Sequence, residues 1–246
     1  MNLTNVKQAI DTKDSAFIQS LSDPYLLVVA LHFALSRHND EMVRVCVQAQ
    51  ADLQTLGPTG MTALQHAVSL EDMTLVECIL EVGPHGASHR TSNAYHHPLL
   101  MAVELGYKGL VQLLVENGVD VNQISKPVQC ASGRSAMMAA CELGYAPIVA
   151  YLIRKGGKDY QARGLVAAVK HGHYDCVALM MKLATERQLK RALIVAQDAG
   201  HMHIVSLLCP NPPGITARFE PTRSHDHHAI RNRIAKLKQR FVRIPA

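Results

Sequence analysis

Histidines are the residues of this chain whose type and spacing could most readily do chemistry. The sequence holds 14 of them, and two close pairs stand out, His171 with His173 and His201 with His203. Neutral imidazole is a common zinc ligand, so four such side chains on adjacent turns could form a tetrahedral site. A second cluster, SHDHHAI at 224–230, adds an aspartate, but successive residues of a helix point to different sides. At both places we weigh metal binding against a purely structural role and favour the structural role.

Nucleophilic and acid–base chemistry has weaker support. The six cysteines include no Cys-x-x-Cys pair, and most lie in apolar stretches, where a thiol packs as a small hydrophobe. Cys130 falls in a long loop and is the cysteine we expect to be exposed. Glu104 and Glu142 could be read as a carboxylate pair, but a ladder of equivalent surface positions explains them better. Because phosphate-loop, dinucleotide and nucleophile-elbow motifs are also missing, we predict no enzyme activity, no cofactor and no small-molecule substrate. An enzyme with a His-rich metal site is the less favoured alternative.

The elements that would position these side chains follow a repeat. An alanine followed nine residues later by a valine occurs six times, at Ala34/Val43, Ala67/Val76, Ala102/Val111, Ala140/Val149, Ala168/Val177 and Ala196/Val205. A glycine stands four residues after each of the last four alanines, where it can end a helix in the left-handed conformation. The valine and the apolar pair that follows it form one helical stripe. Each repeat therefore predicts helix, turn, helix, and stacked neighbours would bury the apolar faces.

Three segments carry a resemblance to a known family. They are GMTALQHA at 60–67, HHPLLMA at 96–102 and RSAMMAA at 134–140, and the stretch AVELGYKGLVQLLVENGVDVN at 102–122 extends the similarity over a full repeat. This pattern resembles the ankyrin repeats, whose unit of about 33 residues opens T-P-L-H-x-A. The resemblance implies an all-α fold, a solenoid of stacked antiparallel helix pairs with short hairpin loops. It also accounts for His173 and His201 structurally, because the family favours histidine directly after the turn glycine.

The repeat pattern suggests three segments. We expect capping helices at 1–23, about six ankyrin repeats at 24–213, and a basic tail with an amphipathic helix at 214–246. The loop at 123–133 contains an insertion. The last two repeats are only 28 residues long, so we expect bare helix pairs there.

The resemblance also implies a function, protein–protein recognition by a scaffold. In the family, contacts come from the concave face, formed by the first helices and the hairpin tips. The residues that would lie there are Ser36, Arg37, Ser69, Leu70, Glu104, Leu105, Glu142, Leu143, Lys170, His171, Asp198 and Ala199. Leu70, Leu105 and Leu143 would form a solvent-facing apolar row, with glutamates beside two of them, and would favour a partner with an apolar ridge and basic flanks. Alternatively, the tail helix or a loop of the same molecule covers this row.

The tail carries most of the net charge. Residues 214–246 hold eight Lys/Arg and two Asp/Glu, whereas the preceding 213 residues hold 17 basic and 18 acidic groups. Its cations include Arg231, Arg233, Lys236, Lys238 and Arg240. Ile230, Ile234, Leu237 and Phe241 share one helical face, which could dock on the last repeat as a cap. The alternatives are contact with an acidic partner, an anionic membrane or nucleic acid, and a basic localisation signal.

The expected compartment is the cytoplasm. The polar N-terminal stretch does not resemble a secretory signal, and the longest apolar run, at 25–35, is too short to span a bilayer and contains His32. We therefore expect a soluble protein with a buried helix at that run. Arrays of this kind resemble both eukaryotic adaptors and host-directed effectors of intracellular bacteria, so the host cytosol is the alternative location.

Overall fold

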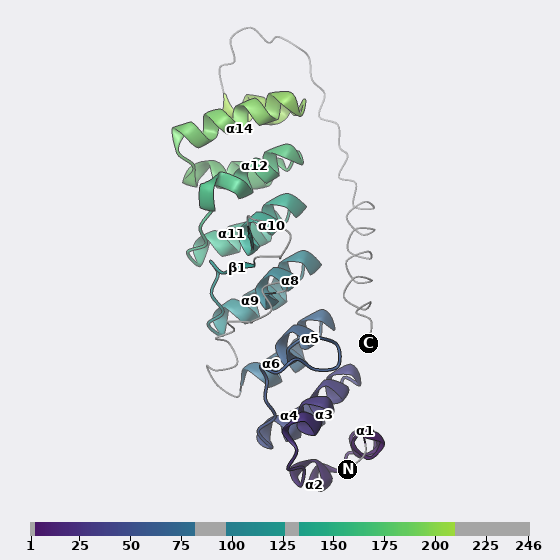
Figure 1. Ribbon diagram of the computed structural model, residues 1–246. Coiled ribbons are helices and arrows are strands. Elements are labelled where there is room, and N and C mark those ends of the chain that lie inside the picture. The colour runs from purple at the N-terminus through teal and green to yellow at the C-terminus, as the bar shows by residue number, and fades with distance from the viewer. Residues whose placement is uncertain (1–2, 82–96, 126–132, 210–246) are drawn as a thin grey trace. The chain divides into compact units, whose positions relative to one another are not determined.

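The protein is described by a computed structural model that covers residues 3–81, 97–125 and 133–209 (Figure 1). Helices dominate these residues, and the all-α prediction is confirmed. In chain order the α-helices are α1 Leu3–Asp11, α2 Ser15–Gln19, α3 Pro24–Ser36, α4 Asp40–Gln48, α5 Ala63–Ser69, α6 Met73–Leu80, α8 Pro98–Leu105, α9 Lys108–Glu116, α10 Ala136–Leu143, α11 Ala146–Arg154, α12 Arg163–Lys170, α13 Tyr174–Met180, α14 Glu186–Asp198 and α15 Met202–Leu208. Short 3₁₀ turns occur at η1 Tyr160–Ala162 and η2 Met181–Leu183, and strand β1 Ile124–Ser125 pairs antiparallel with β2 Arg134–Ser135.

The described residues form two compact units. The first comprises residues 3–102 and 109–120, and the second comprises 103–108 and 121–209, so α8 and α9 contribute to both. The first unit begins with α1 and α2, where the sequence predicts capping helices. The two 28-residue repeats of the second unit contain the expected bare helix pairs, α12 with α13 and α14 with α15.

Local chemistry explains where the helices begin. Asp23 caps α3, since its carboxylate accepts the backbone N–H of Tyr25, and Pro24 occupies the first helical position, where no N–H is needed. Ser135 caps α10 through the N–H of Met138. The apolar run after Pro24 forms the buried helix that the sequence predicts, with His32 buried in it.

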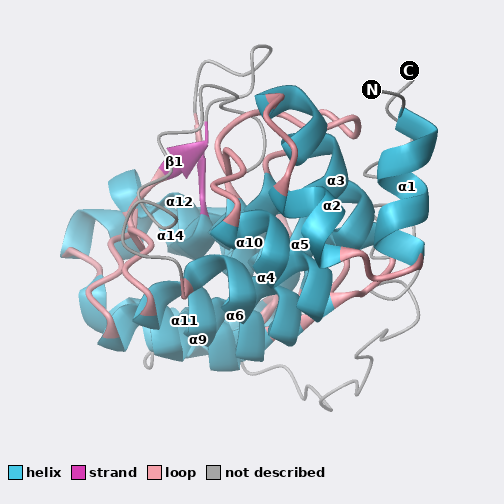
Figure 2. Ribbon diagram, turned by 90° about the horizontal axis from the view of Figure 1, so that it is seen from below, coloured by secondary structure: helices cyan, strands magenta, loops and turns pink. Residues whose placement is uncertain are grey.

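Within each unit the helices lie in two layers (Figure 2). In the first unit α3 packs beside α5, and α4 packs beside α6. In the second unit α10, α12 and α14 pack in succession, while α11, α13 and α15 form the other layer. We call these the first-helix layer and the second-helix layer, because each repeat contributes one helix to each. Stacking buries the alanines and valines of the repeat pattern, which form the core of both units.

The turn between the two helices of a repeat explains the histidines that follow its glycine. Gly144 ends α10 with φ +76°, a conformation that favours glycine. A Cβ at this position would lie 2.6 Å from the ring of His173, which belongs to the next repeat. The His173 Nε2 also lies 3.0 Å from the carbonyl oxygen of Glu142. Each such ring therefore rests on the preceding turn and helps to fix the spacing between repeats.

The last repeats replace the hairpin by a tight connection. Asp159 accepts hydrogen bonds from the backbone N–H groups of Gly164, at 2.7 Å, and Leu165, at 2.9 Å, and so caps α12. Gln161 and Ala162 adopt positive φ angles of 58° and 55°, which are unfavourable for residues with a Cβ. This strained connection, residues 155–162, joins α11 to α12, and α12 packs directly beside α10.

Among the described residues, none of the helices combines the length and the apolar character needed to cross a bilayer.

Candidate functional site

The predicted partner-binding residues of the first unit lie at the ends of first helices. Arg37 follows α3, is exposed, and forms an ion pair with Asp11. Ser69 ends α5 and donates its hydroxyl to the carbonyl of His66, while Leu70 is half-buried. In the second unit, Glu104, Leu105, Glu142, Leu143, Lys170, His171 and Asp198 occupy the equivalent places on α8, α10, α12 and α14.

The prediction of a solvent-facing leucine row is wrong. Leu105 and Leu143 are only 8% and 7% exposed. Because α12 packs along α10 and His173 rests on the turn after Leu143, the next repeat encloses this leucine. Tyr145 rests in the same way on Gly106, next to Leu105. These two leucines are core residues, so they present little surface to a partner.

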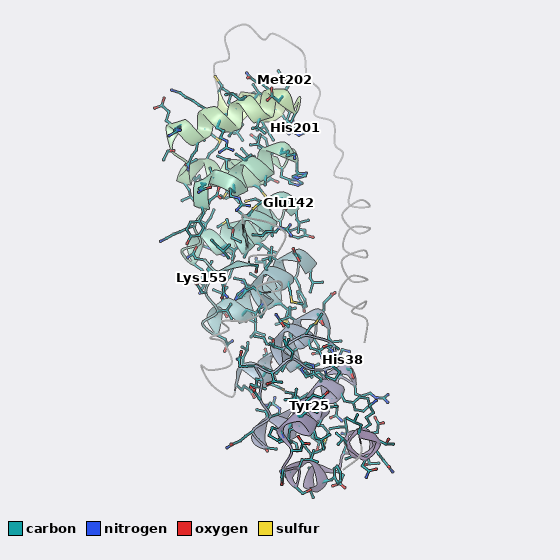
Figure 3. All side chains as sticks on the ribbon, viewed as in Figure 1. Tyr25, His38, Glu142, Lys155, His201 and Met202 are labelled. Carbon is teal, nitrogen blue, oxygen red and sulfur yellow. The ribbon has the colours of Figure 1, made fainter. Side chains whose placement is uncertain are left out.

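The interpretation of the two glutamates as a surface ladder is also wrong. Glu104 is 7% exposed, and its carboxylate is paired with the guanidinium of Arg134. The same guanidinium contacts the Glu142 carboxylate at 2.7 Å through its other terminal nitrogen. Figure 3 labels Glu142 at the end of α10. One arginine from β2 thus pairs with two carboxylates of successive repeats and offsets one of their two negative charges, which weakens the acidic flank expected from the sequence.

A groove lies on the first-helix layer of the second unit. Its floor is apolar, and its rim is basic. The lining residues, which define the first-helix groove, are Met138, Glu142, Gln161, Arg163, Val166, Ala167, Lys170, His171 and Arg191. They come from α10, α12, α14 and the connection before α12, so the stacking of three successive first helices creates the groove. The groove brings together three of the predicted residues, Glu142, Lys170 and His171, whereas Asp198 is exposed elsewhere on α14.

The charge of this groove is positive. Arg163 donates to the carbonyl of Gly133 at 2.6 Å, which fixes its guanidinium at the rim. The side chains of Lys170 and Arg191 are exposed and form no hydrogen bond or ion pair within the described part of the chain. Since Glu142 is already paired with Arg134, the groove offers uncompensated positive charge to a ligand. Sequence reasoning missed Arg163 and Arg191, although both stand five residues before the repeat alanine, where Ala168 and Ala196 follow.

The histidine pairs have structural contacts. The His201 Nε2 lies 3.2 Å from the carbonyl oxygen of Lys170, and its ring rests on Gly172. Figure 3 labels His201, which directly precedes α15. His171 and His173 stack on each other with ring centroids 6.1 Å apart. Across the described ranges, three or more His, Cys, Asp or Glu side chains do not gather in a way that could hold a metal ion.

A second pair of histidines is buried in the first unit. His32 and His66 stack with ring centroids 5.1 Å apart, and their Nδ1 atoms lie 3.1 Å from each other. Burial lowers the pKa of His32 to about 3, with a further contribution from the charge of His66. Burial likewise lowers the pKa of His66 to about 4, and the charge of His38 adds to the effect. Both rings are therefore neutral core residues at physiological pH.

Four of the five described cysteines, Cys46, Cys78, Cys141 and Cys176, are also core residues, whereas Cys209 is half-buried. Cys141 and Cys176 are fully buried, as the sequence predicts, and burial raises the pKa of the Cys176 thiol to about 12. Such thiols are protonated and inert at neutral pH. Three predictions fall outside the described residues: exposure of Cys130, the histidine cluster at 224–230, and the basic tail at 214–246.

Comparison with known proteins identifies the family that shares this architecture. A family model for ankyrin repeats (3 copies) matches the chain in overlapping stretches, at residues 31–125, 71–164 and 99–190, which together span more than half of its length. The chain belongs to the ankyrin repeat family. The resemblance that rests on the segments at 60–67, 96–102 and 134–140 is thereby confirmed, as is the all-α ankyrin fold.

The ankyrin chain has relatives in sequence and in structure. It is similar to the B-cell lymphoma 3 protein homolog of Mus musculus, with 32% identity over 160 residues, covering 57% of this chain and 34% of the mouse protein. The chain thus spans about a third of the length of that relative. Two solved structures are similar in fold. The human ASB11 ankyrin repeat domain gives a TM-score of 0.60 at 18% identity, over 85% of this chain and 99% of that one. The ankyrin repeat domain of Bcl-3 gives 0.56 at 23% identity, over 75% and 82%.

These comparisons support the predicted class of function. The ankyrin repeats support a protein–protein interaction scaffold, and the comparisons favour none of the lipid-binding, nucleic-acid-binding or enzymatic alternatives. Ankyrin repeats are typically non-enzymatic interaction modules. The comparisons do not test the predicted partner-binding residues or the domain boundaries, which stay predictions.

Proposed function

We propose that this ankyrin chain binds a partner protein through the first-helix groove, and that it acts as a scaffold without catalytic activity. The observation that carries the proposal is the exposed pair Lys170 and Arg191 on successive first helices, above the apolar side chains of Met138, Val166 and Ala167. Two cations that pair with none of the described residues, over an apolar floor, suit a polypeptide that presents carboxylates beside an apolar side chain.

The charge of the groove reverses the partner chemistry expected from the sequence. A partner with basic flanks would require free glutamates, but Arg134 occupies both Glu104 and Glu142. An acidic segment of a partner protein therefore fits the groove better. The undescribed segments of the chain itself at 82–96, 126–132 and 210–246 contain only two acidic residues, Glu220 and Asp226, so they supply little complementary charge.

The experiment compares capture of partner proteins by the wild-type chain and by the variant Lys170→Glu/Arg191→Glu. Both side chains are exposed, so the variant should unfold at nearly the same temperature as the wild type. We expect mass spectrometry to show at least one protein with an acidic segment whose recovery falls about tenfold or more in the variant. Equal recovery of all captured proteins by the two chains would refute the assignment of the groove.

A matched control reverses the same number of charges outside the groove. Lys155→Glu/Lys158→Glu changes two exposed cations after α11 that do not line the first-helix groove. This control should retain the partners that depend on Lys170 and Arg191. Loss of the same partners in both variants would indicate a non-specific electrostatic effect and count against the proposal.

We further infer a cytoplasmic location. Cys46, Cys78, Cys141 and Cys176 are free and buried, which suits a reducing compartment. Cell fractionation tests this inference directly, and recovery of the native chain from a secreted or membrane fraction would contradict it.

A further inference from the structure

The second-helix layer of the second unit carries another groove. Its lining residues, which define the second-helix groove, are Lys108, Pro147, Ala150, Ile153, Arg154, Leu179, Lys182 and Leu183. The apolar members come from one face of α11, from α13 and from η2. Lys155, labelled in Figure 3, follows directly after α11 and marks this side of the unit. None of the residues that line the first-helix groove takes part, so the two surfaces are separate.

The repeat pattern does not require a leucine at position 183, which lines this groove. Leu183 is 51% exposed and stands six residues after the repeat valine Val177. The same place in the four earlier repeats is occupied by Ala49, Val82, Asn117 and Lys155, so the repeat pattern accepts small, polar or apolar residues there. Since three of its four counterparts are small or polar, an exposed leucine here presents apolar surface that the array does not need for packing. It therefore indicates contact with another molecule.

The charges around the second-helix groove also differ from those at the equivalent positions of earlier repeats. Arg154 and Lys182 stand five residues after the repeat valines of successive repeats, and both are exposed. The equivalent residues of the two preceding repeats are Glu81 and Glu116, so the sign of the charge reverses at this groove. Lys108 adds a third cation, and the lining includes no carboxylate.

The three cations of the second-helix groove have few contacts with other described residues. Arg154 lies over the ring of Tyr151, with its guanidinium carbon 5.9 Å from the ring centroid, and this contact leaves its charge open to solvent. The side chains of Lys108 and Lys182 make no hydrogen bond or ion pair within the described ranges. Successive packed helices lie about 8–10 Å apart, so Arg154 and Lys182 can flank a single ligand segment that rests on Ile153 and Leu183.

We propose that the second-helix groove is a second docking site, which binds an acidic amphipathic helix of another protein. The leucine-type side chains of that helix lie on Ile153, Leu179 and Leu183, and its carboxylates pair with Arg154 and Lys182. A second copy of this chain would place like charges together at this surface, and the undescribed segments of the chain hold only two acidic residues. The chain then carries separate partner surfaces on its two helix layers and can hold two proteins at once.

The test measures peptide binding in a background where the first-helix groove is disabled. The full chain with Lys170→Glu/Arg191→Glu is titrated against a fluorescein-labelled helical peptide of 18 residues, with leucines at i, i+4, i+7 and i+11 and glutamates beside them. Adding Arg154→Glu/Lys182→Glu should weaken binding at least about tenfold, and adding Leu183→Ser about fivefold. The control Lys158→Glu reverses an exposed charge outside the groove and should change the affinity less than twofold.

Two further arms decide the class of ligand. A peptide in which serine replaces each leucine should bind at least fivefold more weakly, since the apolar floor then has no counterpart. Vesicles containing phosphatidylserine and a 20-nucleotide single-stranded DNA should not bind in a manner that depends on Arg154 and Lys182. Equal binding of the serine peptide, absence of peptide binding, or groove-dependent binding of vesicles or DNA would each overturn the proposal. Because the first-helix groove is already disabled, none of these results bears on the proposed function.

Discussion

Single residues set the spacing of the repeats, and Gly144 is the clearest example. Its positive φ disfavours any side chain, and the His173 ring occupies the place of a Cβ. Gly144→Ala should therefore destabilise the fold by about 2 kcal/mol or more, which combines the left-handed strain with overpacking. Gly156→Ala is the matched control, because Gly156 has φ +81° but no neighbouring atom within 4 Å of the new Cβ. It should cost only about 1 kcal/mol in chemical denaturation.

A further variant separates the two contributions. In a His173→Ala background, Gly144→Ala should cost about as much as Gly156→Ala, because the ring that opposes the new methyl group is gone. If the cost of Gly144→Ala is the same with and without His173, the contact between repeats does not set the spacing as we describe.

The buried pair of His32 and His66 predicts acid sensitivity. Their pKa values of about 3 and about 4 lie below the value of about 6.5 expected in the unfolded chain. Between pH 4 and about 6.5 the unfolded chain binds more protons at these histidines than the folded chain does. The histidines therefore contribute their full stabilisation above about pH 6.5, and the free energy of unfolding falls as the pH decreases towards 4. Each histidine contributes a slope of at most about 1.4 kcal/mol per pH unit.

The measurement is urea denaturation at a series of pH values, together with NMR titration of the histidine ring protons. The variant His32→Leu/His66→Leu should lose less stability than the wild type between pH 6.5 and 4.5. Ring protons of His32 and His66 that titrate near pH 6.5 in the folded protein would contradict the burial of neutral rings.

At the level of elements, Arg134 links β2 to α8 and α10 through Glu104 and Glu142. Arg134→Met should destabilise the protein by about 2–3 kcal/mol, because the buried Glu104 then loses its arginine. Adding Glu104→Gln removes the uncompensated charge and should recover about 1 kcal/mol or more in thermal or chemical unfolding. A double variant as unstable as the sum of the two single variants would show that the pair is not coupled.

The elements were predictable to the extent that they depend on short-range patterns. The spacing of alanine, glycine and valine predicts the helix pairs and their turns, because these follow from helical periodicity and from the left-handed glycine. Burial of Leu143 was not predictable in this way, since it depends on α12 and His173 in the next repeat. Pairing of Glu104 with Arg134 likewise joins residues 30 positions apart. Charge at the candidate site was consequently predicted with the wrong sign.

The residues that line the grooves were also predictable only in part from the sequence. Lys170 and His171 were found from their place beside the turn glycine, but Arg191 joins them only because α14 packs against α12. A comparison of equivalent positions across repeats does provide a usable signal. It shows that Arg154 and Lys182 replace the acidic residues of earlier repeats, and it requires no structure.

At the level of the whole molecule, the account assigns partner binding to side chains that packing does not require. The repeats bury their alanines, valines and turn-flanking leucines, and they leave Lys170, His171 and Arg191 open at the first-helix groove. A pre-formed surface of this kind should bind without large rearrangement, because each repeat is held by its neighbours.

Site-specific photo-crosslinking tests this central claim most directly. A benzoylphenylalanine is placed at His171, which lines the first-helix groove, and in separate control chains at Lys158 and at Arg44, which lie outside it. With a partner that depends on Lys170 and Arg191 for capture, we predict a crosslink from position 171 and none from positions 158 and 44. Crosslinks from the control positions, with none from position 171, would contradict the account.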